Sequence, residues 1–550
     1  MRHIRQIRAS IGAIGLAMLL VACDSVPFSS PFSSSSETPK PTETLSKRFA
    51  GAVVGDEPRA VVEARNALAQ GGTAADAAVA MFFSLAAVSP SSASLGSGGV
   101  CVVYDGAKGK AEALDFVARA PATVPASSDR PSAVPGSPLG FWALHARYGK
   151  LPWSQLVTPG ERLAQFGAQA SRTLIGDLGP VLAPLLEDTE SRRVFADATG
   201  KPVAEGANFV QSDLARVMAV IRTGGAADFY RGAFARELVA AVKAAGGSLE
   251  VSDLEAYRAE WRPTVQVKYG FRTAHFAPPP AAAGGVAAQM LAMLDSGGRF
   301  GGGSADRLHA LAESGMRAYA DRGRWMREDY SSAESPSALV SGATIDRMTR
   351  SFDRQRHTAP ADLNPVLAAR PENPAATSFT IVDRTGSAVA CALTMNNAFG
   401  TGRMARGTGI LLAALPNAQG RGPISLGPML AVTESSKQFF LAAGASGGIA
   451  APTALMNVVA RIAVLDQPLD AAIRSPRVHH GGAPDITYHE PEVPRDDVLQ
   501  LTNRGHTVAA TPTLGLVNAI SCADGMPRNP NTCSAASDPR GHGIALTISE

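Results

Sequence analysis

The feature that most constrains the fold is residues 372–402, which read as two strands joined by a tight turn. Phe379 and Ile381 lie in the first apolar run, and residues 388–393 form a second one. The intervening Asp383-Arg384-Thr385-Gly386 predicts a hairpin, with Gly where the backbone needs a positive φ. A polar lead containing Pro374 precedes the first strand. We therefore expect a buried sheet to begin where an exposed segment ends.

Two further regions have an interpretable order of elements. Residues 438–443 predict a strand, 444–448 a tight Gly-rich loop and 449–465 an amphipathic helix, so the loop's backbone N–H groups could approach a developing negative charge. Nearer the start, residues 57–69 predict a helix, and Thr73-Ala74-Ala75-Asp76 is a capping box that opens a second. The Gly-rich residues 95–99 precede a strand, the wrong order for a phosphate-binding loop.

These stretches together resemble the gamma-glutamyltransferase family (gamma-glutamyltranspeptidase, glutathione hydrolase). The resemblance extends from about residue 50 to 543 and includes residues 71–80, Leu114-Asp115-Phe116, the Pro-rich segment 278–285, the predicted helix 309–322, and segments 475–480 and 536–540. It implies an α+β fold, a four-layer αββα sandwich of the N-terminal-nucleophile hydrolase type. It also implies a large-subunit-like portion, residues 47–375, and a small-subunit-like portion, residues 376–550.

Family members are made as precursors that cut themselves before a Thr, whose hydroxyl is then the nucleophile and whose α-amine is the base. The family pattern aligned without gaps over residues 372–383 places Ala376 at the nucleophile and Thr377 one position later. Ala376 has no hydroxyl and cannot attack a carbonyl. Thr377 is a candidate nucleophile only if a β-bulge turns it, because a one-residue slip points a side chain to the other sheet face.

The resemblance also assigns roles to other positions. It implies that Thr394 supports the nucleophile, Gly447 and Gly448 form the oxyanion hole, and Asn396 and Ser425 contact substrate. The family's carboxylate-binding Arg is replaced by Val117, and Arg119 lies two places later on the same predicted strand face, as a substrate contact or a solvated edge residue. Ala418 replaces an Asp that binds the substrate amine, and Leu415 replaces a nearby Gln.

These substitutions favour a family member that has lost γ-glutamyl transfer and glutathione hydrolysis and acts as a binding or scaffold protein in the envelope. A small peptide or an amino acid is a candidate ligand. The alternative is an active, self-processed acyltransferase or hydrolase that uses Thr377 on a different amide. A remote alternative is a serine hydrolase, because residues 444–448 also satisfy Gly-x-Ser-x-Gly around Ser446, followed by Asp485 and by His506 or His542. A predicted hairpin at residues 377–393 occupies the place where such an enzyme needs strand–helix units.

The N-terminus has the features of a bacterial lipoprotein signal, residues 1–23. Three arginines precede an apolar stretch, and Leu20-Val21-Ala22-Cys23 resembles a lipobox, so we expect Cys23 to be lipidated. Residues 24–46 are rich in Ser, Pro and Thr and predict a disordered tether. The expected location is the periplasmic side of the cell envelope, anchored in a membrane, with Asp24 favouring the inner one. The three arginines account for the formal net charge of +3, so the mature chain offers no electrostatic argument for binding nucleic acid.

The remaining cysteines and histidines complete the predictions. Cys101 and Cys391 lie within predicted strands and are interpreted as small core residues. Cys522 and Cys533 flank a polar insertion, and in an exported protein they predict a disulfide. His479 and His480 are adjacent and would point to opposite faces of a strand, so neither a metal site nor a cofactor is expected.

Overall fold

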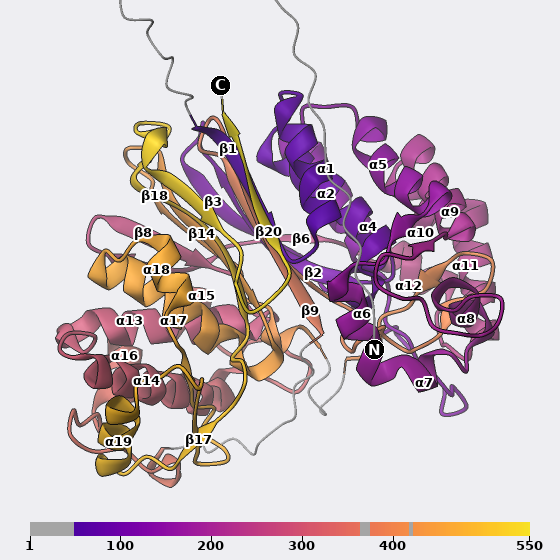
Figure 1. Ribbon diagram of the computed structural model, residues 1–550. Helices are drawn as coiled ribbons and strands as arrows, with labels where there is room; N and C mark the ends of the chain where they lie inside the picture. Colours follow the sequence, from indigo (N-terminus) through magenta and orange to yellow (C-terminus); the bar gives the residue numbers. More distant parts are fainter. Residues whose placement is uncertain (1–48, 364–374, 417–421, 550) are drawn as a thin grey trace, which may run out of the picture. The chain divides into compact units, whose positions relative to one another are not determined.

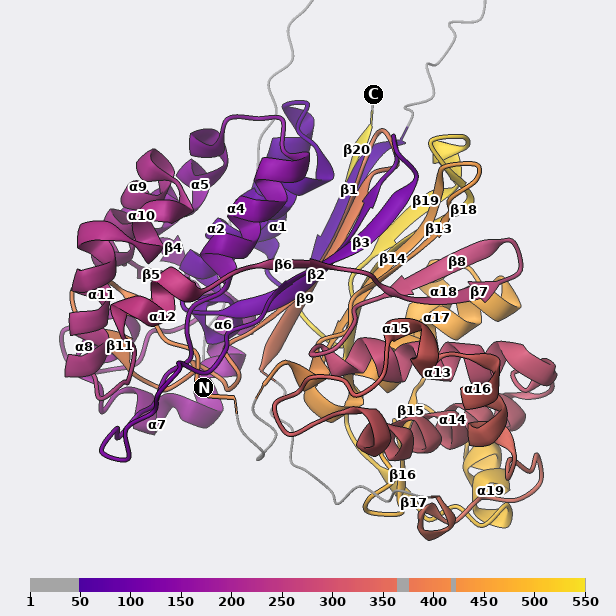
Figure 2. The same cartoon turned by 180° about the vertical axis from the view of Figure 1, so that it is seen from behind.

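The computed structural model describes residues 49–363, 375–416 and 422–549. The predicted signal, the tether and position 418 therefore lie outside the described residues. The described chain is built around two antiparallel sheets that face each other (Figures 1 and 2).

The first sheet combines strands from both portions of the chain. Its order is β20 (Ile544–Ser549), β1 (Phe49–Gly55), β9 (Ala376–Asp383), β10 (Ala388–Thr394), β2 (Gly98–Asp105), β3 (Lys110–Phe116) and β6 (Glu260–Arg262). The second sheet has the order β19 (Cys533–Ala536), β18 (Leu516–Met526), β14 (Gln438–Ser446), β13 (Met429–Thr433), β8 (Arg272–Phe276) and β7 (Val265–Tyr269).

Helices cover the outer face of each sheet (Figure 1). The first sheet is covered by α1 (Pro58–Ala69), α2 (Ala74–Val88) and α4 (Ser137–Tyr148), with α5 (Trp153–Phe166), α9 (Ser212–Gly224) and α11 (Gly232–Ala244) outside them. The second is covered by α13 (Ala282–Asp295) and α17 (Ala451–Leu465), and α14 (Ser304–Trp325) packs against both of these helices.

Shorter elements complete the described chain. The helices are α3 (Pro90–Ala93), α6 (Arg172–Leu178), α7 (Leu182–Leu185), α8 (Thr189–Phe195), α10 (Ala226–Tyr230), α12 (Val251–Ala256), α15 (Pro336–Leu339), α16 (Gly342–Thr349), α18 (Leu469–Arg474) and α19 (Arg495–Asn503). The strands are β4 (Ala168–Gln169), β5 (Asn208–Phe209), β11 (Met404–Ala405), β12 (Ile410–Leu411), β15 (Val478–His479), β16 (Thr487–His489) and β17 (Val508–Ala510).

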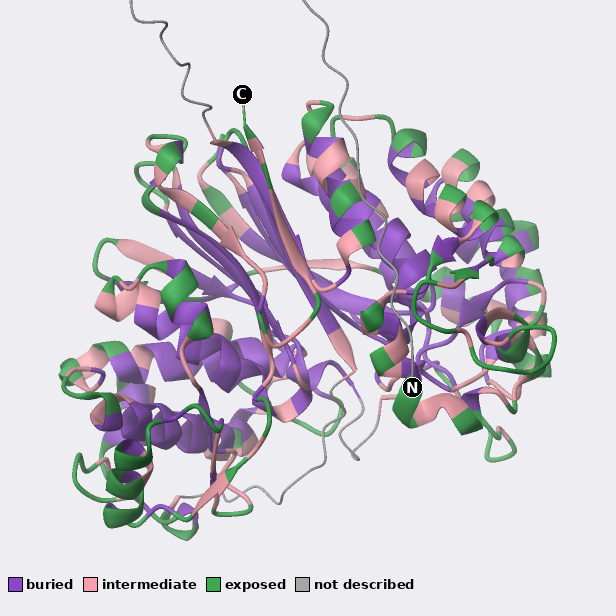
Figure 3. Ribbon diagram, viewed as in Figure 1, coloured by how far each residue is buried: buried purple, intermediate pink, exposed green. Residues whose placement is uncertain are grey.

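Three apolar clusters separate the four layers. One lies between the first sheet and its helices, one between the second sheet and its helices, and one between the sheets, where Val382, Leu430 and Phe439 meet. Figure 3 shows the two sheets and the inner helices as the most continuously buried part of the molecule. The predicted four-layer αββα sandwich is confirmed, because alternation along each central strand supplies two apolar faces.

Local sequence features agree with the elements that form. The Asp383–Gly386 turn joins β9 to β10, with Gly386 at φ 81°, and Thr73 and Asp76 make the predicted capping box. One described helix, Gly448–Leu465, is long and apolar enough to cross a membrane, but most of it is buried in the protein, where it packs against α13 and β14. It is a core helix.

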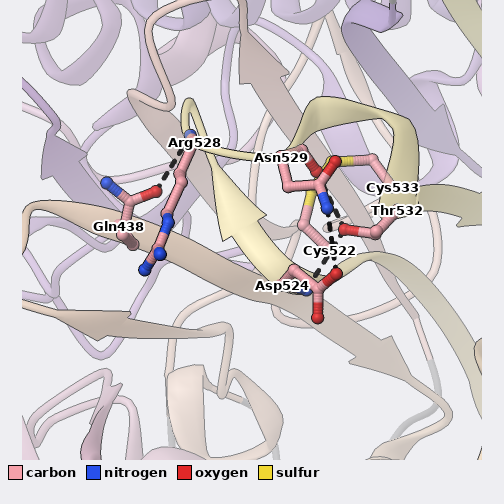
Figure 4. The surroundings of a disulfide bond; sticks show 7 residues. All are labelled: Gln438, Cys522, Asp524, Arg528, Asn529, Thr532 and Cys533. Carbon is pink, nitrogen blue, oxygen red and sulfur yellow. Dashed lines mark hydrogen bonds between the residues drawn. A yellow bond between two sulfur atoms is a disulfide. The ribbon is translucent and has the colours of Figure 1, made fainter.

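Two disulfides join neighbouring strands. Cys522 of β18 and Cys533 of β19 are bonded at the polar insertion (Figure 4). Cys101 of β2 is bonded to Cys391 of β10, so the prediction that these are two separate core residues is wrong. They are 290 positions apart, and only the pairing of β2 with β10 places them directly opposite each other, with Cα atoms 4.1 Å apart.

Candidate functional site

The ends of β9 and β10 bring together the position aligned with the family nucleophile and its expected supporting Thr. Thr394 is directly opposite Ala376 in the ladder. The Thr394 hydroxyl donates a hydrogen bond to the carbonyl oxygen of Ala375 at 2.6 Å and accepts one from the Asn396 N–H at 3.0 Å. The side chain of Ala376 is a methyl group at the position where the resemblance implies a hydroxyl. The Thr394 hydroxyl uses its proton in the hydrogen bond to the Ala375 carbonyl oxygen.

Thr377 points to the opposite face of the sheet. The β9–β10 ladder runs from Ala388–Val382 to Thr394–Ala376 without a shift, so the bulge that could turn Thr377 is not formed. Thr377 is 3% exposed, and its hydroxyl donates to the Asp56 carboxylate at 2.9 Å. Its side chain therefore faces the helical layer, away from Thr394.

Asp56, which sequence reasoning missed, holds the beginning of β9. Its carboxylate accepts hydrogen bonds from the Ser378 N–H at 3.1 Å and from the Asn518 amide at 2.7 Å, besides the Thr377 hydroxyl. Burial raises the pKa of Asp56, and these three donors partly oppose that effect. A carboxylate directly after the apolar strand β1 was the one sequence feature that could have identified it.

Asn396 and Ser425 are both buried near this end of the sandwich. Asn396 has φ 60°, and its side-chain amide donates to the carbonyl oxygen of Ala414 at 2.9 Å. Ser425 ends a short 3₁₀ turn, Pro423–Ser425, and is 6% exposed. Asn396 is thus committed to backbone contacts.

Arg119 is an ion-paired edge residue. Its guanidinium lies 3.2 Å from the Asp115 carboxylate and 3.3 Å from the Glu260 carboxylate, and it stacks over the Tyr257 ring. Burial lowers its pKa, but attraction to Asp115 and the neighbouring oxygens outweighs this and raises it. Arg119 is therefore engaged with Asp115 and Glu260, and Val117 is apolar and buried.

The Gly447-Gly448 loop forms between β14 and α17. Gly447 has φ 122°, and an added Cβ would lie 2.6 Å from the Cα of Gly515, so a side chain does not fit there. A Cβ on Gly444 would meet the Ser378 side chain, so β14 and β9 face each other across the two sheets, and the loop follows at the same end as Ala376. The predicted Gly-rich loop therefore forms between a strand and a helix, at the end of β14.

The serine-hydrolase alternative is wrong on geometry. Ser446 ends β14, whose neighbours β13 and β18 are both antiparallel to it. The ring nitrogens of His506 contact His309 and Thr487, and the Asp485 carboxylate contacts His357 and His480. Among the described residues no hydrogen bond joins Ser446 to any histidine, and His542 is exposed.

Two neighbouring groups of described residues have the types and spacing that could hold a metal ion: His309, Glu313 and His506, and His357, His480 and Asp485. His357, His480 and Asp485 place their ligand atoms within 4.8 Å of one another. Burial disfavours the charged imidazolium, but hydrogen bonds to Glu313 and Asp485 outweigh this and raise the pKa of His357. The Gly482 N–H donates to Nδ1 of His480, which leaves the proton on the Nε2 that a metal would need. The cluster is satisfied by its own hydrogen bonds.

An open cavity of about 760 Å³ lies beside the end of β10. Asn397, Ala414 and Leu415 line it next to Asn396, and the lining also carries charges of both signs, Asp129, Arg130, Asp188, Glu190, Arg403 and Arg406. Arg403 is paired with Asp129 at 2.8 Å. The cavity suits a small polar molecule better than an apolar one.

Known proteins resemble this chain along most of its length. The family model described as Gamma-glutamyltranspeptidase matches residues 60–548. The glutathione hydrolase proenzyme of Pseudomonas aeruginosa (strain PAO1) is 30% identical over 547 residues, covering 90% of this chain and 94% of that protein. The corresponding protein of Escherichia coli (strain K12) is 28% identical over 515 residues, covering 86% and 87%.

A solved structure supports the fold independently. The cephalosporin acylase from Bacillus halodurans aligns with a TM-score of 0.77 at 22% identity, covering 94% of this chain and 99% of that one, a likeness that establishes the fold alone. The family model and these relatives match the chain along most of its length, and the solved structure has the same fold. The chain belongs to the gamma-glutamyltranspeptidase family.

Proposed function

We propose that this protein is an envelope lipoprotein of the family that has lost γ-glutamyl chemistry and binds a small peptide or amino acid. The observation that carries the proposal is the methyl side chain of Ala376 directly opposite Thr394. Without a hydroxyl there, neither self-cleavage nor acyl transfer can begin by the N-terminal nucleophile route.

The substrate-binding positions support the same conclusion. The relatives are named glutathione hydrolases, and a γ-glutamyl substrate presents both an α-carboxylate and an α-amine. Val117 offers neither charge nor hydrogen bond at the aligned carboxylate position, and Arg119 is paired with Asp115 and Glu260. An unpaired, desolvated charge costs about 2–5 kcal/mol of binding.

The cavity of about 760 Å³ offers a place for the proposed ligand. Arg130 and Arg406 are exposed on its rim, with Glu187 and Glu190 nearby. Charges of both signs around one hollow suit a zwitterionic molecule, with its carboxylate toward arginine and its amine toward the acidic residues.

The alternative is an enzyme that cuts before Thr377 and uses its hydroxyl. Its hydroxyl already donates to Asp56, a carboxylate that could accept a proton. The observation against it is the orientation of Thr377 toward the helical layer, away from Thr394 and the Gly447-Gly448 loop.

Intact mass and a reducing denaturing gel of the purified protein test the proposal. We expect one uncut chain and no γ-glutamyl transfer or hydrolysis. Ala376→Thr should restore self-cleavage between residues 375 and 376, because Thr394 and the glycine donors remain, but not glutathione turnover. Thr377→Ala is the matched control and should change neither result. Two chains from the wild type, the smaller beginning with Thr377, would contradict the proposal and establish the alternative.

A further inference from the structure

One end of the sandwich is made almost entirely of turns, and residue 49 enters the fold there. Phe49 pairs with Ser549 at this end. The turns are residues 105–110 between β2 and β3, 269–272 between β7 and β8, 383–388 between β9 and β10, 433–438 between β13 and β14, and 523–529 at the end of β18. We call this set, with residues 147–150 at the end of α4, the turn face.

Hydrogen bonds join these turns into one continuous surface. Lys437 Nζ donates to the carbonyl oxygen of Ala107 at 2.8 Å, and the Gly106 N–H donates to the Ser387 hydroxyl at 3.1 Å. The Thr433 hydroxyl reaches the carbonyl oxygen of Phe271 at 3.4 Å. The Arg528 N–H donates to the Gln438 side chain at 3.0 Å, as Figure 4 shows. The turn face is therefore part of the folded sandwich.

The turn face is basic in a protein whose mature charge is balanced. Its described residues include eight cations: Lys108, Lys110, Arg147, Lys150, Arg272, Arg384, Lys437 and Arg528. The carboxylates on or beside it are Asp105, Glu112, Asp383, Glu434, Asp466 and Asp524, which leaves two positive charges in excess. Lys108 is paired with Asp105, and Lys110 and Arg147 are paired with Glu112. Asp383 is buried and accepts the Ala74 N–H, so it contributes little to the surface. Lys108, Arg147, Lys150 and Arg384 surround an open hollow of about 400 Å³.

An aromatic side chain projects from the same face. Phe271 is 70% exposed at the tip of the β7–β8 hairpin. Arg272 beside it stacks over the Phe271 and Phe440 rings at 4.8 and 4.4 Å, which holds the hairpin tip in place. An exposed aromatic ring amid cations is the composition that binds a lipid–water interface.

We infer that the turn face docks on the anionic surface of a phospholipid bilayer, with Phe271 entering the interface. The inference rests on the lipid anchor proposed above, because the predicted anchor Cys23 precedes Phe49, the residue at which the described chain enters this face. Ala376 lies at the far end of β9, about 25 Å from the turn face at the usual rise per strand residue. Docking would therefore turn the aligned catalytic end of the sandwich away from the membrane.

The test uses the full lipidated chain carrying Phe271→Trp, in vesicles of equal parts phosphatidylglycerol and phosphatidylcholine with brominated acyl chains. We expect the added tryptophan to be quenched in these vesicles and not in phosphatidylcholine alone. Phe166→Trp is the matched control, because Phe166 is 67% exposed at the end of α5 remote from the turns and should stay unquenched. The wild type gives the background of the four native tryptophans.

Charge reversal separates docking from anchoring. Lys108→Glu with Arg528→Glu should weaken the quenching of the Phe271→Trp chain roughly tenfold or more, and raised salt should do the same. Arg172→Glu with Arg193→Glu reverses two exposed cations elsewhere and should have no effect. If the protein floats with the vesicles but the tryptophan at position 271 is unquenched, the anchor is present and the docking inference is wrong. A turn face that binds another protein would give this result. Protein that floats with no vesicle overturns both the docking and the anchor.

Discussion

At the scale of single residues, the two candidate nucleophile positions, Ala376 and Thr377, differ in the direction of their side chains. Adjacent residues of a strand face opposite layers. The hydroxyl of Thr377 is bound to Asp56 on the helical side, while the methyl group of Ala376 faces the other sheet. The interpretation of Thr377 as a structural residue therefore leads to a stability prediction.

Thr377→Ala should lower the free energy of unfolding by about 1–3 kcal/mol, because the buried Asp56 carboxylate loses a hydrogen-bond donor. Thr377→Ser keeps the hydroxyl and should stay near the wild type. Urea denaturation followed by circular dichroism gives both values. Equal stability of the three proteins would show that the contact with Asp56 contributes nothing.

His479 should make the protein sensitive to acid. Burial, with a smaller contribution from neighbouring His480, lowers the pKa of His479 to about 3. Between pH 6.5 and that value the unfolded chain binds a proton that the folded chain does not, so stability falls as the pH falls. Relative to His479→Asn, the wild type should lose about 1.4 kcal/mol per pH unit in this range. Parallel stability curves of the two proteins from pH 7 to 5 would contradict this prediction.

At the scale of elements, the sequence was most informative where structure depends on near neighbours. The β9–β10 hairpin, the Thr73 capping box and the Gly-Gly turn before α17 are each encoded within a few residues. The pairing of Ala376 with Thr394 is likewise set within this one hairpin, because that ladder is local. What could not be predicted depends on distant segments: the contact of Asp56 with Thr377 and Asn518, and the pairing of Arg119 with Glu260.

The two disulfides should stabilise the protein unequally. In the chain-entropy model, a cross-link over 290 residues contributes about 5–6 kcal/mol, and one over 11 residues about 3 kcal/mol. Cys101→Ala with Cys391→Ala should therefore lower stability more than Cys522→Ala with Cys533→Ala. Guanidinium unfolding of the two double variants provides the comparison, and the reverse order would show that local packing outweighs loop length.

At the scale of the whole molecule, the resemblance implied one fold from two portions of chain, and the first sheet bears this out. It alternates strands from both portions, with β9 and β10 inserted between β1 and β2. Such interleaving cannot be deduced from periodicity, which specifies each strand but not its neighbour. The predicted boundary at residue 375 therefore divides the sequence but not the packed core.

The proposed lipid anchor has a direct consequence for fractionation. We expect the wild type in the membrane fraction after lysis without detergent, and Cys23→Ala in the soluble fraction, because the tether itself carries no apolar segment. Cys522→Ala is a matched cysteine variant that should remain membrane-bound. Wild-type protein in the soluble fraction would contradict the lipoprotein prediction.

The bond between Cys101 and Cys391 would keep the two portions of the chain covalently joined even if the chain were cut between them. It crosses from β2 to β10 and thus joins the large-subunit-like and small-subunit-like portions. A chain nicked anywhere between these cysteines would remain one covalent particle in an oxidising compartment, with the same sheets and the same core. A substitution that prevented cleavage before residue 376 would therefore remove the N-terminal nucleophile but leave both sheets covalently connected as before. Selection for correct folding alone would not have opposed such a substitution.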